Sequence, residues 1–396
     1  RSPSRGLGDV YKRQDLDSPR LGTSSYQIAT AELALLEFDK SIATSEVALN
    51  NLKKAQNRYL PVEGDLLYIM AKAYSEKNEI QKAKELYLES ESIYNEAYPD
   101  EYSREYLILL RDYALFLAEN GESEKAVTMA DKIYRHIVKN DGDDSFPIIK
   151  EFTNLSSVYF AAGDYKMANH WAQKGNEFLD GKLSQATSIL DSIQIEFYRP
   201  TITHLEVQSL LKTTSNIDTL FLKEQLTKIN KAVAVLERRK TTTFTIEDIN
   251  SLLTQYKSLN GISKQLYHDL YTATQRDVYL DKTLEIHESG IYNRIRTQFN
   301  IRNNIRFGGI PSEVETREKA LKKSISSVLQ TNDEAAIATY FEANEAWSKF
   351  LDSLQLNYPK YYQLRYATIE QPIANLQKRI PEPVSYTHLT LPTKRI

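Results

Sequence analysis

The sequence predicts an all-α fold in which helical hairpins stack side by side as an α-solenoid. The first observation is a repeat, because three segments follow one pattern when they are aligned on Ala83, Ala126 and Ala168, which lie 43 and 42 residues apart. The second is composition: 13 glycines and 12 prolines among 396 residues are too few to punctuate a barrel or a doubly wound sheet. A fixed period of this length is typical of solenoids.

Each copy of the repeat reads as a helix, a tight turn and a second helix. Twelve positions before the aligned alanine stands a small residue that would let two helices touch: Ala71, Ala114 and Ser156. Five positions before it stands a residue that tolerates the left-handed backbone at a helix end: Asn78, Gly121 and Gly163. We therefore expect clear copies at residues 62–97, 103–140 and 147–180.

The rest of the chain is assigned from helix spacing and punctuation. Residues 26–59 read as a degenerate first copy, so that the repeat region covers residues 15–183. Residues 184–306 read as divergent helical repeats, with Pro200 expected to kink or split the first of their helices. Residues 307–358 begin with a Gly-Gly turn and continue as an antiparallel coiled hairpin. Its second helix carries a heptad seam of Ile337, Tyr340, Asn344, Trp347, Leu351, Leu354 and Tyr358.

The two ends of the chain do not continue the neighbouring patterns. Residues 1–14 and residues 384–396 look like translated sequencing-adapter DNA, and we exclude both from the fold prediction. Residues 359–383, before the second of these segments, are expected to form an extended connector followed by a short helix.

Composition narrows the classes of function. A formal charge of −3 predicts no general attraction to nucleic acid, and the absence of cysteine excludes disulfides, thiolate metal sites and a cysteine nucleophile in this chain. No apolar run approaches the roughly 18 residues that span a bilayer, so we expect a soluble, cytoplasmic chain without membrane contact. The six histidines are scattered, and we predict neither a metal site nor a cofactor.

Several segments carry a resemblance to a known family. The repeats resemble tetratricopeptide repeats (TPR) of the long, kinesin-light-chain-like type. The later sequence resembles the region before the catalytic domain of bacterial CHAT proteins, which are caspase- and separase-like cysteine peptidases fused to such repeats. This likeness is carried by YLDKTLEIHESGIYNRIR (279–296), FGGIPSEVETREKALKKSI (307–325) and NYPKYYQLRYATIEQPIANLQKRIP (357–381).

The resemblance implies what this chain does and lacks. In the family, the peptidase fold would begin just after Pro381, and its catalytic histidine and cysteine would lie further along. Such a peptidase needs a thiolate activated by a histidine, and this chain has no cysteine, so we expect it to be non-catalytic by itself.

The resemblance also implies a binding groove, because the first helices of tetratricopeptide arrays line a concave surface. Transferred by register, the outward positions suit an extended or helical peptide with some negative charge. They are Tyr68, Lys72, Arg111, Leu115, Thr153, Ser157 and Phe160.

A second candidate site is a basic patch flanked by aromatic residues, formed by Arg294, Arg296, Arg302 and Arg306. Cations interleaved with aromatic rings can bind single-stranded nucleic acid or an acidic protein face. The structural alternative is a helix end whose cations complement the helix macrodipole, and it is favoured over nucleic acid.

The sequence thus predicts a protein-binding, regulatory repeat scaffold of a CHAT-type peptidase. Its partner would be a protein or peptide, including the peptidase domain of the same parent. By family analogy, binding in the groove would change the curvature of the repeats, and the hairpin at residues 307–358 would relay the change. Two rivals stay open: a free-standing adaptor, and an RNA-binding helical array centred on the arginines.

Overall fold

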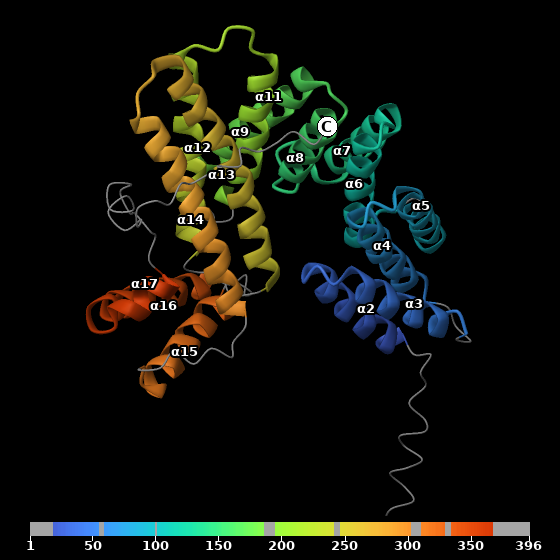
Figure 1. The fold of residues 1–396 in the computed structure, drawn as a ribbon. Helices are drawn as coiled ribbons and strands as arrows, with labels where there is room; N and C mark the ends of the chain where they lie inside the picture. The colour runs from blue at the N-terminus through green and yellow to red at the C-terminus, as the bar shows by residue number, and fades with distance from the viewer. Residues whose placement is uncertain are drawn as a thin grey trace, which may run out of the picture. The chain divides into compact units, whose positions relative to one another are not determined.

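The computed structural model describes residues 19–54, 59–99, 101–185, 195–240, 246–301, 310–328 and 334–366. All regular secondary structure in these ranges is α-helical, which confirms the predicted fold class (Figure 1). The backbone contacts divide the chain into two compact units, the first ending at Gly163 and the second beginning at Asp164. The adapter-like segments and residues 367–383 lie outside the described residues.

The first unit is a stack of helical hairpins. Each helix contacts the next, and contacts between α2 and α4 and between α6 and α8 bring first helices of neighbouring hairpins together. This stacking hides the apolar flank of one hairpin behind the next. The helices are α2 (Pro19–Ala34), α3 (Phe38–Leu52), α4 (Leu60–Glu76), α5 (Ile80–Ala97), α6 (Arg104–Glu119), α7 (Ser123–Asp141) and α8 (Ile148–Ala161).

The turns between helices follow the repeat. Asn78, Gly121 and Gly163 have φ values of 62°, 85° and 84°, as the repeat predicted. The turn between α2 and α3 uses the same left-handed backbone at Leu36, with φ 63°. This turn could not be predicted, because a leucine in that conformation carries a steric cost that glycine or asparagine avoids, and no sequence rule places one there.

The small residues of the repeat are all buried. Each has an exposed fraction of 0%. The burial of every small position of the pattern agrees with the predicted role of these residues in helix packing. These positions are Ala71, Ala83, Ala114, Ala126, Ser156 and Ala168.

The second unit continues with longer helices. Contacts join α9 to α11, α11 to α12, α12 to α13, and α13 to α14. Residues of α11, α12 and α13 form an apolar core that includes Ile229, Leu266 and Leu270. Pro200 lies in the first turn of α11, where the missing amide is harmless, so it starts this helix. The helices are α9 (Tyr165–Gln185), α11 (Arg199–Thr213), α12 (Thr219–Lys240), α13 (Ile246–Thr274) and α14 (Val278–Ile301).

Three further helices of this unit pack around Trp347. They are α15 (Ser312–Val328), α16 (Glu334–Asn357) and α17 (Pro359–Arg365). Of the predicted seam, Trp347, Leu351, Leu354 and Tyr358 pack in this cluster, and the structure adds Ala343 and Phe350. Nothing is described of the side chains of Ile337, Tyr340 and Asn344.

The expectation of an extended chain after residue 358 was wrong, because α17 is helical. Pro359 occupies its first turn, and the buried carboxylate of Glu318 on α15 accepts hydrogen bonds from the hydroxyls of Tyr361 and Tyr366. Glu318 also accepts a hydrogen bond from Lys322 Nζ at 2.6 Å. These bonds couple the short helix to α15, which the local sequence could not reveal.

Candidate binding surfaces

The predicted groove residues of α4 form a hydrogen-bonded cluster with α6. The Tyr68 hydroxyl donates to Asp112 Oδ2 at 2.6 Å, and Lys72 Nζ donates to the same oxygen at 2.7 Å. Burial first, and then the Asp112 carboxylate, raises the pKa of Tyr68 well above its usual value, so the hydroxyl stays a donor. The side chains of Lys72 and Asp112 both stay more than a third exposed, at 38% and 35%.

The next step of the repeat carries a second ion pair. The Arg111 guanidinium on α6 binds the carboxylate of Glu151 on α8, with Nε 3.1 Å from Oε1 and 3.2 Å from Oε2. A further bond joins Nη2 to Oε1. The Glu151 side chain is 0% exposed and that of Arg111 is 16% exposed, so this pair is buried where the Lys72 pair is not.

The remaining predicted groove residues lie on the same first helices and are half-buried. Leu115 lies on α6, and Thr153, Ser157 and Phe160 lie on α8. The Thr153 hydroxyl donates to the Ile149 carbonyl at 2.9 Å within its own helix. The structure thus joins Tyr68 with Lys72 through Asp112 and ties Arg111 to Glu151, while Leu115 contributes apolar surface.

Two acids of this face were not predicted from the sequence. Asp112 and Glu151 each lie 40 residues after the cation that they bind. A search for opposite charges about 40 residues apart on successive first helices could have found them, since the first helices of neighbouring hairpins stack against each other.

The predicted arginine patch is only partly described. Arg294 and Arg296 lie in α14, and nothing is described of their side chains. Arg302 and Arg306 lie outside the described residues.

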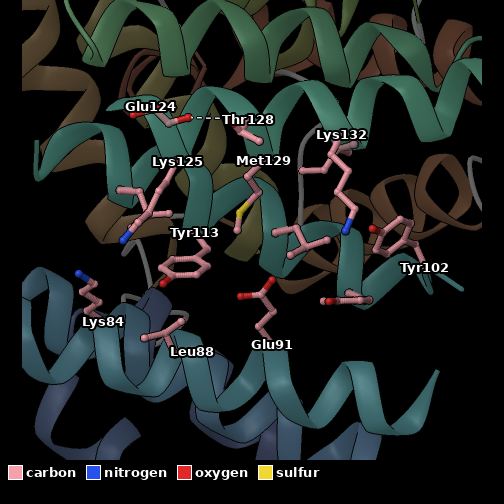
Figure 2. A pocket seen from close by; sticks show the side chains of 14 residues that line it. Lys84, Leu88, Glu91, Tyr102, Tyr113, Glu124, Lys125, Thr128, Met129 and Lys132 are labelled. Atoms are coloured by element: carbon pink, nitrogen blue, oxygen red, sulfur yellow. Dashed lines mark hydrogen bonds between the residues drawn. The ribbon is translucent and has the colours of Figure 1, made fainter. Parts of the chain in front are cut away.

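A cleft that the sequence did not indicate runs between α5, α6 and α7. Its volume is about 680 Å³. Side chains of α5 and α7 approach from two sides, and Tyr113 of α6 lies between them (Figure 2). The lining consists of Lys84, Leu88, Glu91, Tyr102, Tyr106, Leu110, Tyr113, Leu117, Glu124, Lys125, Thr128, Met129, Lys132 and Ile133.

The charged side chains of the cleft differ in whether a group of opposite charge binds them. Lys84 and Lys125 both bind Glu122, the latter at 2.7 Å, and Lys132 Nζ lies 5.7 Å from the centre of the Tyr102 ring. Glu91 makes no hydrogen bond or ion pair to any described residue. Burial raises the pKa of Glu91, and the charge of Lys132 opposes this only in part.

The cleft and the first-helix face use opposite sides of α6. Tyr106, Leu110 and Tyr113 follow helix spacing along the side that faces the cleft. Leu115 lies about half a turn around the helix from that stripe, at about 100° per residue. A ligand on one surface therefore need not touch the other.

Within the described ranges, no three His, Cys, Asp or Glu residues cluster so that they could hold a metal ion. No helix of these ranges combines the length and apolar character that crossing a bilayer requires.

Comparison with solved structures finds helical repeat proteins. The crystal structure of BtubC (BKLC) from P. vanneervenii matches with a TM-score of 0.43 and 15% identity, covering 61% of this chain and 90% of that chain. A putative kinesin light chain with nearly identical TPR-like repeats from Podosopora anserina matches with a TM-score of 0.43 and 15% identity, covering 56% and 98%. The crystal structure of a point variant of the latter gives 0.43 and 14%, covering 55% and 95%. No family model and no curated protein matches the sequence.

Proposed function

We propose that the chain is a non-catalytic protein-binding scaffold that takes a peptide along the first helices α4, α6 and α8. The observation that carries the proposal is a row of polar side chains along these helices, in which Lys72 on α4 binds Asp112 on α6 and Arg111 on α6 binds Glu151 on α8. Side chains fixed before binding lose little conformational freedom when a ligand arrives.

The chemistry of the row favours peptide groups that accept hydrogen bonds. Lys72 directs its described bonds to Asp112 and Tyr68, and an ammonium has three donors. Arg111 uses Nε and Nη2 on Glu151, which leaves donors on Nη1. Because each cation is paired with an acid, the row offers N–H donors to backbone carbonyls more than it offers unbalanced positive charge.

Binding at this face is tested with two variants that add bulk and charge and leave the ion pairs of the row intact. Leu115→Arg and Ser157→Arg should each weaken binding of an isolated peptide or protein partner by at least about tenfold. Val47→Arg on α3, a residue 62% exposed, is the matched control and should leave affinity unchanged. Equal affinity of all three variants would exclude the first-helix face.

We further propose that the scaffold is the regulatory arm of a CHAT-type cysteine peptidase. The support is the order of the three segments at residues 279–296, 307–325 and 357–381, together with the repeats. A partner on α4, α6 and α8 would shift the stacking of the repeats, and α15 and α16 would relay the shift.

The parentage is tested by extending the reading frame past Pro383. A following caspase-like sheet with a histidine and a cysteine is the expected result. A frame that ends near residue 381 would favour the free-standing adaptor, and a domain of another class would exclude the CHAT parentage.

A further inference from the structure

We infer that the cleft between α5, α6 and α7 is a second binding site, and that it accepts a lysine or arginine side chain of a peptide partner onto Glu91. The inference is independent of the proposed first-helix face, because the two surfaces lie on opposite sides of α6. It rests on the shape of the cleft, its aromatic lining and the balance of its charges.

The shape suits a peptide segment. The lining residues follow one stripe along α6, from Tyr106 to Leu117, which corresponds to a length of about 16 Å at 1.5 Å per residue. The floor is apolar, with Leu110, Tyr113 and Leu117 each at most 4% exposed. An elongated groove with an apolar floor accommodates the apolar face of a short helix or strand.

The charges specify what the occupant should carry. The lysines at one end, Lys84 and Lys125, are already neutralised by Glu122. Glu91 has no such partner among the described residues, and Figure 2 shows its carboxylate turned away from α5 towards α6 and α7. A half-buried carboxylate without a hydrogen bond is unfavourable until a donor reaches it. The complementary group is therefore a cation with N–H donors.

The aromatic lining adds selectivity for the same class of group. Tyr102, Tyr106 and Tyr113 all line the cleft, and Lys132 already shows that a cation can lie over the Tyr102 ring. Aromatic faces attract ammonium and guanidinium groups, most strongly where water is excluded. Lys132 also competes for Glu91, because its charge acts on that carboxylate. Its removal should strengthen binding of a cationic partner.

The test uses a display library of random twelve-residue peptides selected against the immobilised full chain. Peptides with a lysine or arginine between apolar residues should be enriched. Their dissociation constants, measured by fluorescence anisotropy, should rise at least about tenfold with Glu91→Gln and fall about two- to fivefold with Lys132→Gln. Replacing the lysine or arginine of the peptide by norleucine should raise the dissociation constant by the same factor as Glu91→Gln.

Matched variants separate this site from the first-helix face. Glu96→Gln makes the same chemical change at an exposed position on α5 outside the cleft, and it should leave affinity unchanged. Ser157→Arg should also leave it unchanged, while Tyr102→Leu should weaken it.

Three results would overturn the inference. Acidic peptides whose affinity rises with Glu91→Gln and falls with Lys132→Gln would reverse the charge assignment. Peptides that are lost with Ser157→Arg and indifferent to Glu91→Gln would place binding at the first-helix face alone. Failure to enrich any peptide that responds to Glu91→Gln or Tyr102→Leu would remove the cleft as a site.

Discussion

The hairpins α4 to α8 and the C-terminal helices α15 to α17 are held together by different means. In the hairpins, small residues recur at fixed places, and each first helix binds the next through an acid and a base 40 residues apart. In the C-terminal helices, one buried acid, Glu318, collects Lys322, Tyr361 and Tyr366. The repeated hairpins distribute their polar contacts over several residues, whereas the non-repeating C-terminal helices concentrate theirs on a single side chain.

The largest loss of stability is expected when the buried ion pair between Arg111 and Glu151 is broken. Arg111→Met leaves the fully buried Glu151 carboxylate without its cation, and should lower the free energy of unfolding by about 3–5 kcal/mol. Lys72→Met breaks a half-exposed pair and should cost less than about 1 kcal/mol. Urea unfolding followed by circular dichroism measures both. Equal losses in the two variants would mean that burial does not make one ion pair more important for stability than the other.

The next effect concerns the C-terminal acid. Glu318→Ala leaves two tyrosine hydroxyls and Lys322 without their acceptor and should cost about 2–3 kcal/mol. Tyr361→Phe removes one of these donors and should cost about 1 kcal/mol. Fluorescence of Trp347 in a Trp171→Phe background reports this region, since the sequence holds two tryptophans. If Glu318→Ala costs no more than Tyr361→Phe, the acid does not hold these helices together.

A smaller, pH-dependent effect is expected in the first unit. Burial raises the pKa of Asp65 from 3.8 to about 6, although the Tyr94 hydroxyl bond opposes the shift. At Asp65, the folded state therefore binds more protons than the unfolded state between about pH 4 and pH 6. The contribution of Asp65 to the free energy of unfolding is greatest below this window and falls as pH rises through it.

The loss should be about 2 kcal/mol in the unfolding free energy from about pH 4 to pH 7, relative to Asp65→Asn. Urea unfolding of both proteins at several pH values gives the difference. If the stability of the wild type rises with pH relative to that of Asp65→Asn, the raised pKa of Asp65 is contradicted.

The smallest effect is expected at a turn that breaks the repeat pattern. Leu36→Gly relieves a left-handed leucine that is 71% exposed, and should stabilise the first unit by about 0.5–1 kcal/mol. Asn78→Gly replaces a residue that already tolerates this backbone and should change stability by a smaller amount. The melting temperature measures both, and a lower value for Leu36→Gly would show that its side chain contributes contacts that outweigh the strain.

Predictability differed between these regions for a physical reason. Ala126 and Gly121 could be assigned from sequence because repetition shows the same requirement in several copies. Glu318 could not, since its partners Tyr361 and Tyr366 lie 43 and 48 residues away and nothing repeats the arrangement. The helical state of α17 was missed for the same reason. Part of the heptad seam was predicted, because its spacing is local. Phe350 was not predicted, since it packs in the cluster without following that spacing.

The sequence by itself determined the all-α class, the turns at Asn78, Gly121 and Gly163, and the buried small positions, because local backbone preference and a fixed period encode all three. Only the tertiary structure decided how the charges of the described helices are paired. Lys72 and Arg111 found acids on the next first helix, while Glu91 met no donor among the described residues of its aromatic cleft. Pairing depends on which side chains meet when helices stack, and a single sequence does not record those distances.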